Sequence, residues 1–136
     1  MSITKAIIWV DGAARGNPGP AAIAAIIRDE QGRLITSLSR RIGVTTNNRA
    51  EYQAVIAALE KAIDLGARLV QVKSDSELVV NQLNGRYRVK KAELKPLYQR
   101  VRQLQGSLEG FTISHLPREQ NREADRLANK ALDLPG

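Results

Sequence analysis

Five short segments rich in apolar and β-branched residues predict five strands, at residues 6–10, 22–28, 34–42, 69–73 and 111–115. The first strand is expected to end at Asp11. Residues 12–20 contain three Gly and two Pro and predict a loop. A turn at residues 29–32 would join the second and third strands, so the chain should open with an antiparallel meander.

Four further stretches place apolar residues at helical spacing. The first helix should follow the candidate caps at residues 45–48, run to about Leu65 and stop at Gly66. A short helix is expected before Gly85, and longer ones at residues 91–104 and 121–132. The resulting order predicts an α/β fold in which helices flank a five-stranded mixed sheet. Its first three strands should be antiparallel, and the last two should be parallel because helical crossovers lead into them.

Length and composition exclude several kinds of protein. At roughly 150 residues per domain, residues 1–136 are expected to form a single domain. The chain has no Cys and one His, which excludes a disulfide scaffold, a Cys-based zinc site, a thiol nucleophile and a multi-His metal centre. The longest apolar run, residues 21–27, is far shorter than the roughly 20 residues that span a bilayer. With no signal peptide at residues 1–5, we expect a soluble, cytoplasmic protein with no membrane partner, and favour a monomer.

The charge of the chain favours an anionic partner. There are 21 Lys and Arg against 14 Asp and Glu, which gives a net charge of +7. Residues 86–102 carry seven of the basic residues and only one acid, with Tyr87 and Tyr98 between them. Such a segment can neutralise phosphates and place aromatic rings against sugars or bases, so nucleic acid is the first candidate. The alternative is a solvated helix whose long basic side chains cover an apolar stripe.

Four acidic residues lie at the ends of apolar strands or along the apolar stripes of helices, where surface acids are uncommon. Asp11 and Asp75 each close an apolar strand, although Asp75 could instead be a helix N-cap. Glu51 begins the apolar stripe of the first helix, where a carboxylate is costly unless it is paired, protonated or metal-bound. It could also be solvated near the start of that helix. Asp125 borders the apolar stripe of the last helix.

Together, these four carboxylates favour a metal site. Clustered carboxylates repel one another unless a cation lies between them. Hard oxygen ligands select Mg²⁺ or Mn²⁺ over Zn²⁺. In a basic protein, such a site is typical of phosphodiester chemistry with two metal ions.

Four motifs in the same order resemble those of type 1 ribonuclease H, in its branch without a basic handle that occurs in archaea and some bacteria. They lie at residues 11–20, 45–51, 74–76 and 121–128 and extend over nearly the whole chain. The resemblance implies the ribonuclease H-like fold and cleavage of the RNA strand of RNA–DNA hybrids, leaving 5′-phosphate and 3′-hydroxyl ends. It also implies that Asp11, Glu51, Asp75 and Asp125 hold two Mg²⁺ ions, for which Mn²⁺ is a possible substitute.

The resemblance extends to substrate contacts. Asn17, Asn48 and Asn81 match hybrid contacts of the family, Thr46 matches a DNA-phosphate contact, and Asn47 is a further candidate. Amide groups of this kind can reach 2′-hydroxyls and base edges across a wide minor groove.

Two segments depart from the family pattern. His115 occupies the place of a mobile catalytic His, but a glycine-rich loop is replaced here by residues 116–118, so Arg118 is an equal candidate to assist catalysis. Residues 85–95 are short and lack a Trp-rich handle. Hybrid binding is therefore expected either to rest on the basic stretch from Arg86 to Lys95, with Arg86, Arg88, Lys90 and Lys91 as the candidate contacts, or to be weaker.

Other functions compete with this one. The altered loop and the missing handle would also suit a nucleic-acid-binding module with little catalysis. A nuclease that also acts on double-stranded RNA, or on DNA as related nucleases and integrases do, is a further alternative.

Overall fold

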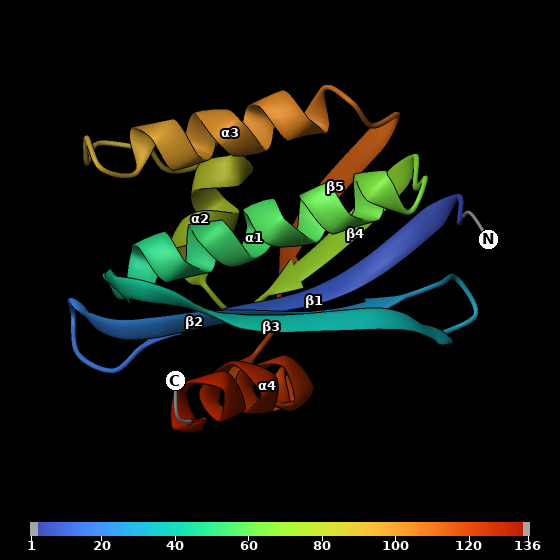
Figure 1. Ribbon diagram of the computed structural model, residues 1–136. Coiled ribbons are helices and arrows are strands. Elements are labelled where there is room, and N and C mark those ends of the chain that lie inside the picture. Colours follow the sequence, from blue (N-terminus) through green and yellow to red (C-terminus); the bar gives the residue numbers. More distant parts are fainter. Residues whose placement is uncertain (1–2, 135–136) are drawn as a thin grey trace.

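The computed structural model describes residues 3–134, and five strands form its central sheet (Figure 1). The strands are β1 (Lys5–Ala14), β2 (Gly19–Arg28), β3 (Leu34–Thr45), β4 (Leu69–Ser74) and β5 (Gly110–His115). They lie in the order β3-β2-β1-β4-β5. The pairs β1–β2 and β2–β3 are antiparallel, and the pairs β1–β4 and β4–β5 are parallel. The predicted mixed sheet is thus confirmed.

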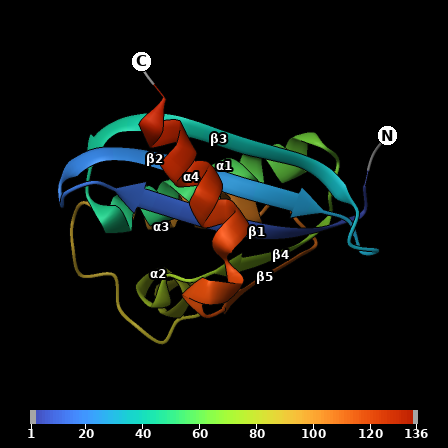
Figure 2. The same ribbon diagram turned by 90° about the horizontal axis from the view of Figure 1, so that it is seen from below.

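Helices cover both faces of this sheet. They are α1 (Asn47–Asp64), α2 (Glu77–Leu83), α3 (Lys95–Gln105) and α4 (Arg122–Asp133), with a short 3₁₀ helix, η1 (Arg118–Gln120), before α4. Helices α1, α2 and α3 lie on one face, and α4 crosses the other face alone (Figures 1 and 2). Among residues 3–134, no helix combines the length and the apolar character needed to cross a membrane.

The main core lies between the sheet and α1. Strand alternation points Ile8 and Val10 of β1 toward this helix, whose own apolar stripe includes Val55 and Leu59, and all four are fully or almost fully buried. A smaller cluster under α4 contains Ala22 and two residues of the helix's last turn. Because β1 is covered on both faces, side chains at its end are shielded from water on both sides.

The predicted loop at residues 12–20 is wrong in its extent. Pairing of β1 with β2 continues through Ala14 and Ala21, so only residues 15–18 connect the two strands. Gly12 and Gly19 serve close packing, whereas Gly16, with a φ of +107°, lies in the short turn itself. A Cβ on Gly12 would lie 2.3 Å from the Ala50 carbonyl group, and one on Gly19 would lie 2.1 Å from the Arg15 oxygen. Similarly, β3 continues beyond its predicted end to Thr45.

The helix predicted at residues 91–104 begins later, at Lys95. Pro96 explains the difference, because proline has no N–H and its ring clashes with a preceding helical carbonyl unless it lies in the first turn. A helix that began at residue 91 would place Pro96 in its interior. The segment from 86 to 94 is therefore a connection of bends, irregular backbone and a turn, which keeps its basic residues off the helix.

Candidate active site

Three carboxylates from separate elements meet at one end of the central strands. Asp11 lies on β1, Glu51 in the second turn of α1, and Asp75 directly after β4. Each offers an oxygen, and these three oxygens lie within 4.8 Å of one another. Parallel β1 and β4 end side by side, which brings Asp11 and Asp75 together.

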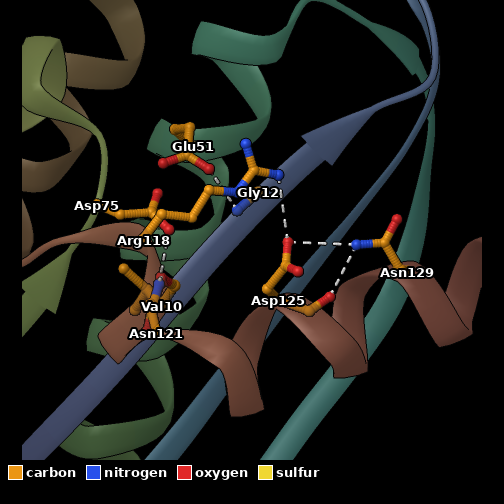
Figure 3. Close-up of polar contacts among 8 residues, drawn as sticks. All are labelled: Val10, Gly12, Glu51, Asp75, Arg118, Asn121, Asp125 and Asn129. Atoms are coloured by element: carbon orange, nitrogen blue, oxygen red, sulfur yellow. Dashed lines mark hydrogen bonds and ion pairs between the residues drawn. The ribbon is translucent and has the colours of Figure 1, made fainter.

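Glu51 reaches the cluster because Gly12 has no side chain. Alternation puts Gly12 on the face of β1 opposite to Asp11, where the backbone of α1 passes at a distance that leaves no room for a Cβ. The Gly12 N–H donates a 2.6 Å hydrogen bond to Glu51 Oε1 (Figure 3). Glu51 is 5% exposed, so the alternative of a solvated acid is excluded.

Burial dominates the electrostatics of the pair formed by Asp11 and Glu51. It raises the pKa of Asp11 from 3.8 to about 8, with the charges of Asp75 and Asp125 adding to the rise and Arg118 opposing it. Burial, followed by the charge of Asp11, also raises the pKa of Glu51 well above its usual range. One oxygen of Asp11, Oδ2, is buried without a hydrogen-bond partner. Removing water from two neighbouring carboxyls therefore disfavours their charged forms.

Asp75 is held by Asn121, the buried residue that precedes α4. The Asn121 Nδ2 donates to the Val10 carbonyl at 2.9 Å and to Asp75 Oδ2 at 3.2 Å. One side chain thus connects the end of β1, the end of β4 and the start of α4. The N-cap of α2 is Ser76, whose hydroxyl accepts from the Val79 N–H, so Asp75 does not have the alternative capping role.

Asp125 faces the same pocket from α4. Its Oδ1 lies 3.6 Å from the Arg118 guanidinium and accepts a 3.3 Å hydrogen bond from Asn129 Nδ2 (Figure 3). The same Asn129 nitrogen donates to the Asp125 carbonyl at 2.9 Å, which ties the side chain to its own helix. Asp125 is more exposed than Asp11 and Glu51 and lies outside the group of three close oxygens.

The donor set fits a hard divalent cation. It consists of carboxylate oxygens, contains neither Cys nor His, and leaves one buried oxygen of Asp11 unpartnered. Mg²⁺ and Mn²⁺ prefer such oxygen ligands, and their charge would offset the repulsion among the acids.

A pocket of about 430 Å³ surrounds the acids. All four predicted acids line it, as do Arg118 and Asn47. His115 does not line this pocket; it ends β5 exposed, paired in register with Ser74. Of the two candidates for assisting catalysis, the structure brings Arg118 to the acids.

The polar residues predicted at the first two motifs lie together at the start of α1. Asn17, in the connection between β1 and β2, accepts a 2.9 Å hydrogen bond from the Asn47 N–H through Oδ1. Thr46 caps the helix and accepts from the Arg49 N–H at 3.3 Å. Asn48 follows in the first turn and is partly exposed. These residues form a polar rim beside the acids.

Of the remaining predicted contacts, Asn81 lies in α2 and the four basic residues lie in the connection from α2 to α3. Asn81 Oδ1 accepts from the Arg86 side chain at 3.4 Å, and Gln82 Nε2 donates to the Arg88 carbonyl at 3.2 Å. The side chains of Arg86, Arg88, Lys90 and Lys91 are exposed. Arg102 instead donates to the Leu83 carbonyl and stacks 4.9 Å from the Tyr98 ring centroid. The basic residues before α3 are therefore exposed, whereas Arg102 within α3 contributes to the packing of that helix.

Sequence reasoning did not assign roles to three residues that shape the site: Gly12, Asn121 and Asn129. Asn121 and Asn129 lie four residues before and after Asp125, the spacing that aligns side chains on a helix. That spacing is the signal that was available. The contact of Asn121 with Asp75 joins residues 46 apart in sequence and has no local signature.

This sheet order, with an acid pocket where the central strands end, defines a ribonuclease H-like α/β protein. Residues 9–131 match the family described as reverse transcriptase-like. Ribonuclease HI of Halobacterium salinarum is 42% identical over 92% of this chain, which spans 63% of that relative.

Solved structures of two ribonucleases H1 have the same fold as this chain. The ribonuclease H1 of Halobacterium salinarum NRC-1 superposes with a TM-score of 0.93 at 41% identity, over 95% of this chain and 98% of that one. LC11 ribonuclease H1, solved in complex with an RNA/DNA hybrid, superposes with a TM-score of 0.90 at 43% identity, over 94% and 96%. The chain belongs to the ribonuclease H family.

The chain spans 63% of the Halobacterium relative and 36% of a bifunctional protein from Mycobacterium tuberculosis. The activities of those whole proteins therefore do not transfer with the shared fold.

Proposed function

We propose that the protein is a Mg²⁺-dependent endoribonuclease that hydrolyses the RNA strand of RNA–DNA hybrids and leaves 5′-phosphate and 3′-hydroxyl ends. The meeting of the Asp11, Glu51 and Asp75 oxygens within 4.8 Å carries this proposal. Three carboxylates this close, two of them buried, are costly without a cation and suited to binding one. The family match and a relative solved with an RNA/DNA hybrid support this choice of substrate class.

In this proposal, Asp11, Glu51, Asp75 and Asp125 hold two Mg²⁺ ions, with Mn²⁺ as a possible substitute. When bound, the ions supply charge that activates an attacking water and stabilises the leaving 3′ oxygen. The chain holds the carboxylates in place through Gly12, Asn121 and Asn129. Arg118, 80% exposed, can turn from Asp125 toward a bound phosphate. His115 would have to reach the site from the end of β5.

The polar rim would recognise the hybrid. Asn17, Asn47 and Asn48 offer amide donors and acceptors to 2′-hydroxyls and base edges, while Thr46 would contact a DNA phosphate. Asn81 and the exposed cations from Arg86 to Lys91 would bind the backbone farther from the cleavage point. We further propose that residues 1–136 act as one domain, as a monomer and in the cytoplasm.

The first test is a gel assay on an end-labelled RNA–DNA hybrid with Mg²⁺, Mn²⁺ or EDTA. We expect metal-dependent cleavage of the RNA strand alone. Asp75→Asn should lower the rate by at least about a hundredfold, because it removes a charged ligand while keeping the side-chain shape. Asp64→Asn, an exposed acid at the end of α1, is the matched control and should cleave at the wild-type rate.

The same assay separates the alternatives. Binding without cleavage in either metal would replace the enzyme by a nucleic-acid-binding module. Equal cleavage of double-stranded RNA would widen the substrate class. Full activity of Asp75→Asn would remove this residue from the proposed metal site.

A further inference from the structure

A second groove runs along α4, on the side of the sheet opposite to the basic residues between α2 and α3. It has a volume of about 420 Å³. We call it the α4 groove. It is lined by Arg122, Asp125, Arg126, Asn129, Lys130 and Asp133. Asp125 and Asn129 also line the acid pocket, so the groove continues directly from the proposed active site.

Three cations of the α4 groove form one row. Arg122, Arg126 and Lys130 are spaced at every fourth residue, lie on one helix face and are exposed. The helical rise separates successive members by about 6 Å along the axis. Figure 2 shows α4 crossing the sheet with no other helix on that face. Because the three residues are also exposed, the row faces solvent.

The acids of the α4 groove do not neutralise these cations. Asp133 pairs with Arg15 at 2.6 Å, and Asp125 pairs with Arg118 at 3.6 Å. Within residues 3–134, Arg122, Arg126 and Lys130 form no ion pair. A row of unpaired cations along a groove is complementary to a chain of regularly spaced phosphates.

We propose that the α4 groove binds the phosphodiester backbone of the nucleic acid where it leaves the active site. This inference rests on the proposed function and extends it. The acid pocket then lies between two cationic surfaces, the α4 groove on one face of the sheet and the exposed residues 86–91 on the other. Such a placement compensates for the short, handle-less segment before α3, because phosphates on both sides of the cleavage point are held.

The test compares two variants from which the same amount of charge is removed. The groove variant carries Arg122→Gln, Arg126→Gln and Lys130→Gln. The control variant carries Lys5→Gln, Lys61→Gln and Arg68→Gln, which lie at the other end of the sheet, at the start of β1, in the last turn of α1 and before β4. Circular dichroism checks that both variants fold.

Binding of a fluorescent RNA–DNA hybrid is measured by anisotropy at several salt concentrations, with Ca²⁺ in place of Mg²⁺ to slow cleavage. The slope of log K against log salt is negative. For the groove variant, we expect its magnitude to decrease by about 3, because three phosphates are no longer neutralised by the protein. Its affinity at about 0.1 M salt should fall at least about tenfold relative to the control. Its kcat with Mg²⁺ at saturating hybrid should match that of the control.

A cross-link locates the bound strand. The chain has no Cys, so Arg126→Cys provides a single attachment point for a photoreactive benzophenone. We expect this position to form an adduct with the hybrid, and Arg68→Cys, the matched position at the far end, to form none.

The outcomes separate the two proposals. If the wild type cleaves the hybrid but the groove variant binds as the control does, the α4 groove proposal is overturned and the proposed function stands. If the Arg126→Cys variant forms the adduct but the wild type does not cleave the hybrid, the groove stands and the function fails. If the wild type binds no nucleic acid, both fail.

Discussion

At the scale of single residues, Gly12 makes the site possible. It follows Asp11 on β1, and alternation turns the two residues to opposite faces of the sheet. Asp11 enters the pocket, while the space beside Gly12 admits the backbone of α1 and with it Glu51. One residue without a side chain thus brings acids from a strand and a helix together.

Gly12→Ala is therefore expected to disturb both stability and the site. Its Cβ would lie 2.3 Å from the Ala50 carbonyl carbon, so α1 must move. We expect the free energy of unfolding to fall by at least about 1–3 kcal/mol, as for other overpacked cores, measured by urea unfolding. Gly106→Ala, at a helical φ of −62° with its nearest contact at 3.2 Å, is the control and should change stability by less than about 1 kcal/mol. Equal effects of the two changes would contradict this account.

At the scale of elements, the connection between α2 and α3, which is the proposed binding segment, has a backbone held by hydrogen bonds. The backbone N–H groups of Arg86 and Tyr87 both donate to the Asn81 carbonyl, and Gln82 holds the Arg88 carbonyl. The side chains remain exposed. Pro96 keeps this segment out of α3, so its cations are free to follow a substrate backbone.

Lys90→Glu with Lys91→Glu should weaken hybrid binding without altering the chemical step. Removing two cations that are proposed to bind phosphates should decrease the magnitude of the slope of log K against log salt by about 2, because fewer counterions are released on binding. The kcat at saturating hybrid should stay within about twofold of the wild type, since neither residue lines the acid pocket. Lys5→Glu with Lys61→Glu provides the control. A lower kcat with an unchanged slope would assign the segment another role.

At the scale of the whole molecule, the buried acids couple stability to pH and to metal. The pKa of Asp11 rises on folding from 3.8 to about 8, and that of Glu51 rises as well. The folded protein therefore binds these protons more tightly than the unfolded chain does. Their contribution to stability is full below about pH 4 and is lost as pH rises toward about 8.

Without metal, this effect should lower the melting temperature as the pH rises from about 5 to about 8. Mg²⁺ should stabilise the protein more at the higher pH, because there it takes the place of the protons lost from the acids. Thermal unfolding with EDTA or saturating MgCl₂ measures both effects. Asp11→Asn, which is uncharged at either pH, should lose the part of this dependence that Asp11 contributes, while the part from buried Glu51 remains. If it retains the full wild-type dependence, Asp11 is not the group responsible.

Much of the fold and of the candidate site was predictable from local pattern. Five apolar segments and four helical stretches gave the correct order, and the parallel pairing followed from the helical crossovers. Asp11 and Asp75 were predictable because each follows an apolar strand, and Glu51 because it begins an apolar stripe. The extent of β1 was not, because the pairing of Ala14 with Ala21 joins two strands across a turn. The start of α3 could have been predicted from Pro96, which is tolerated only in the first turn of a helix.

By itself, the sequence determined the order of the elements, the oxygen-only donor set and the excess of positive charge, because periodicity and residue type are local properties. The tertiary structure alone decided that three of the four acids converge within 4.8 Å, that Arg118 rather than His115 lines their pocket, and that Asn121 joins β1 to Asp75. It also set the two cationic surfaces on opposite faces of the sheet. These relations join residues far apart in the chain, and their distances depend on how helices pack against the sheet.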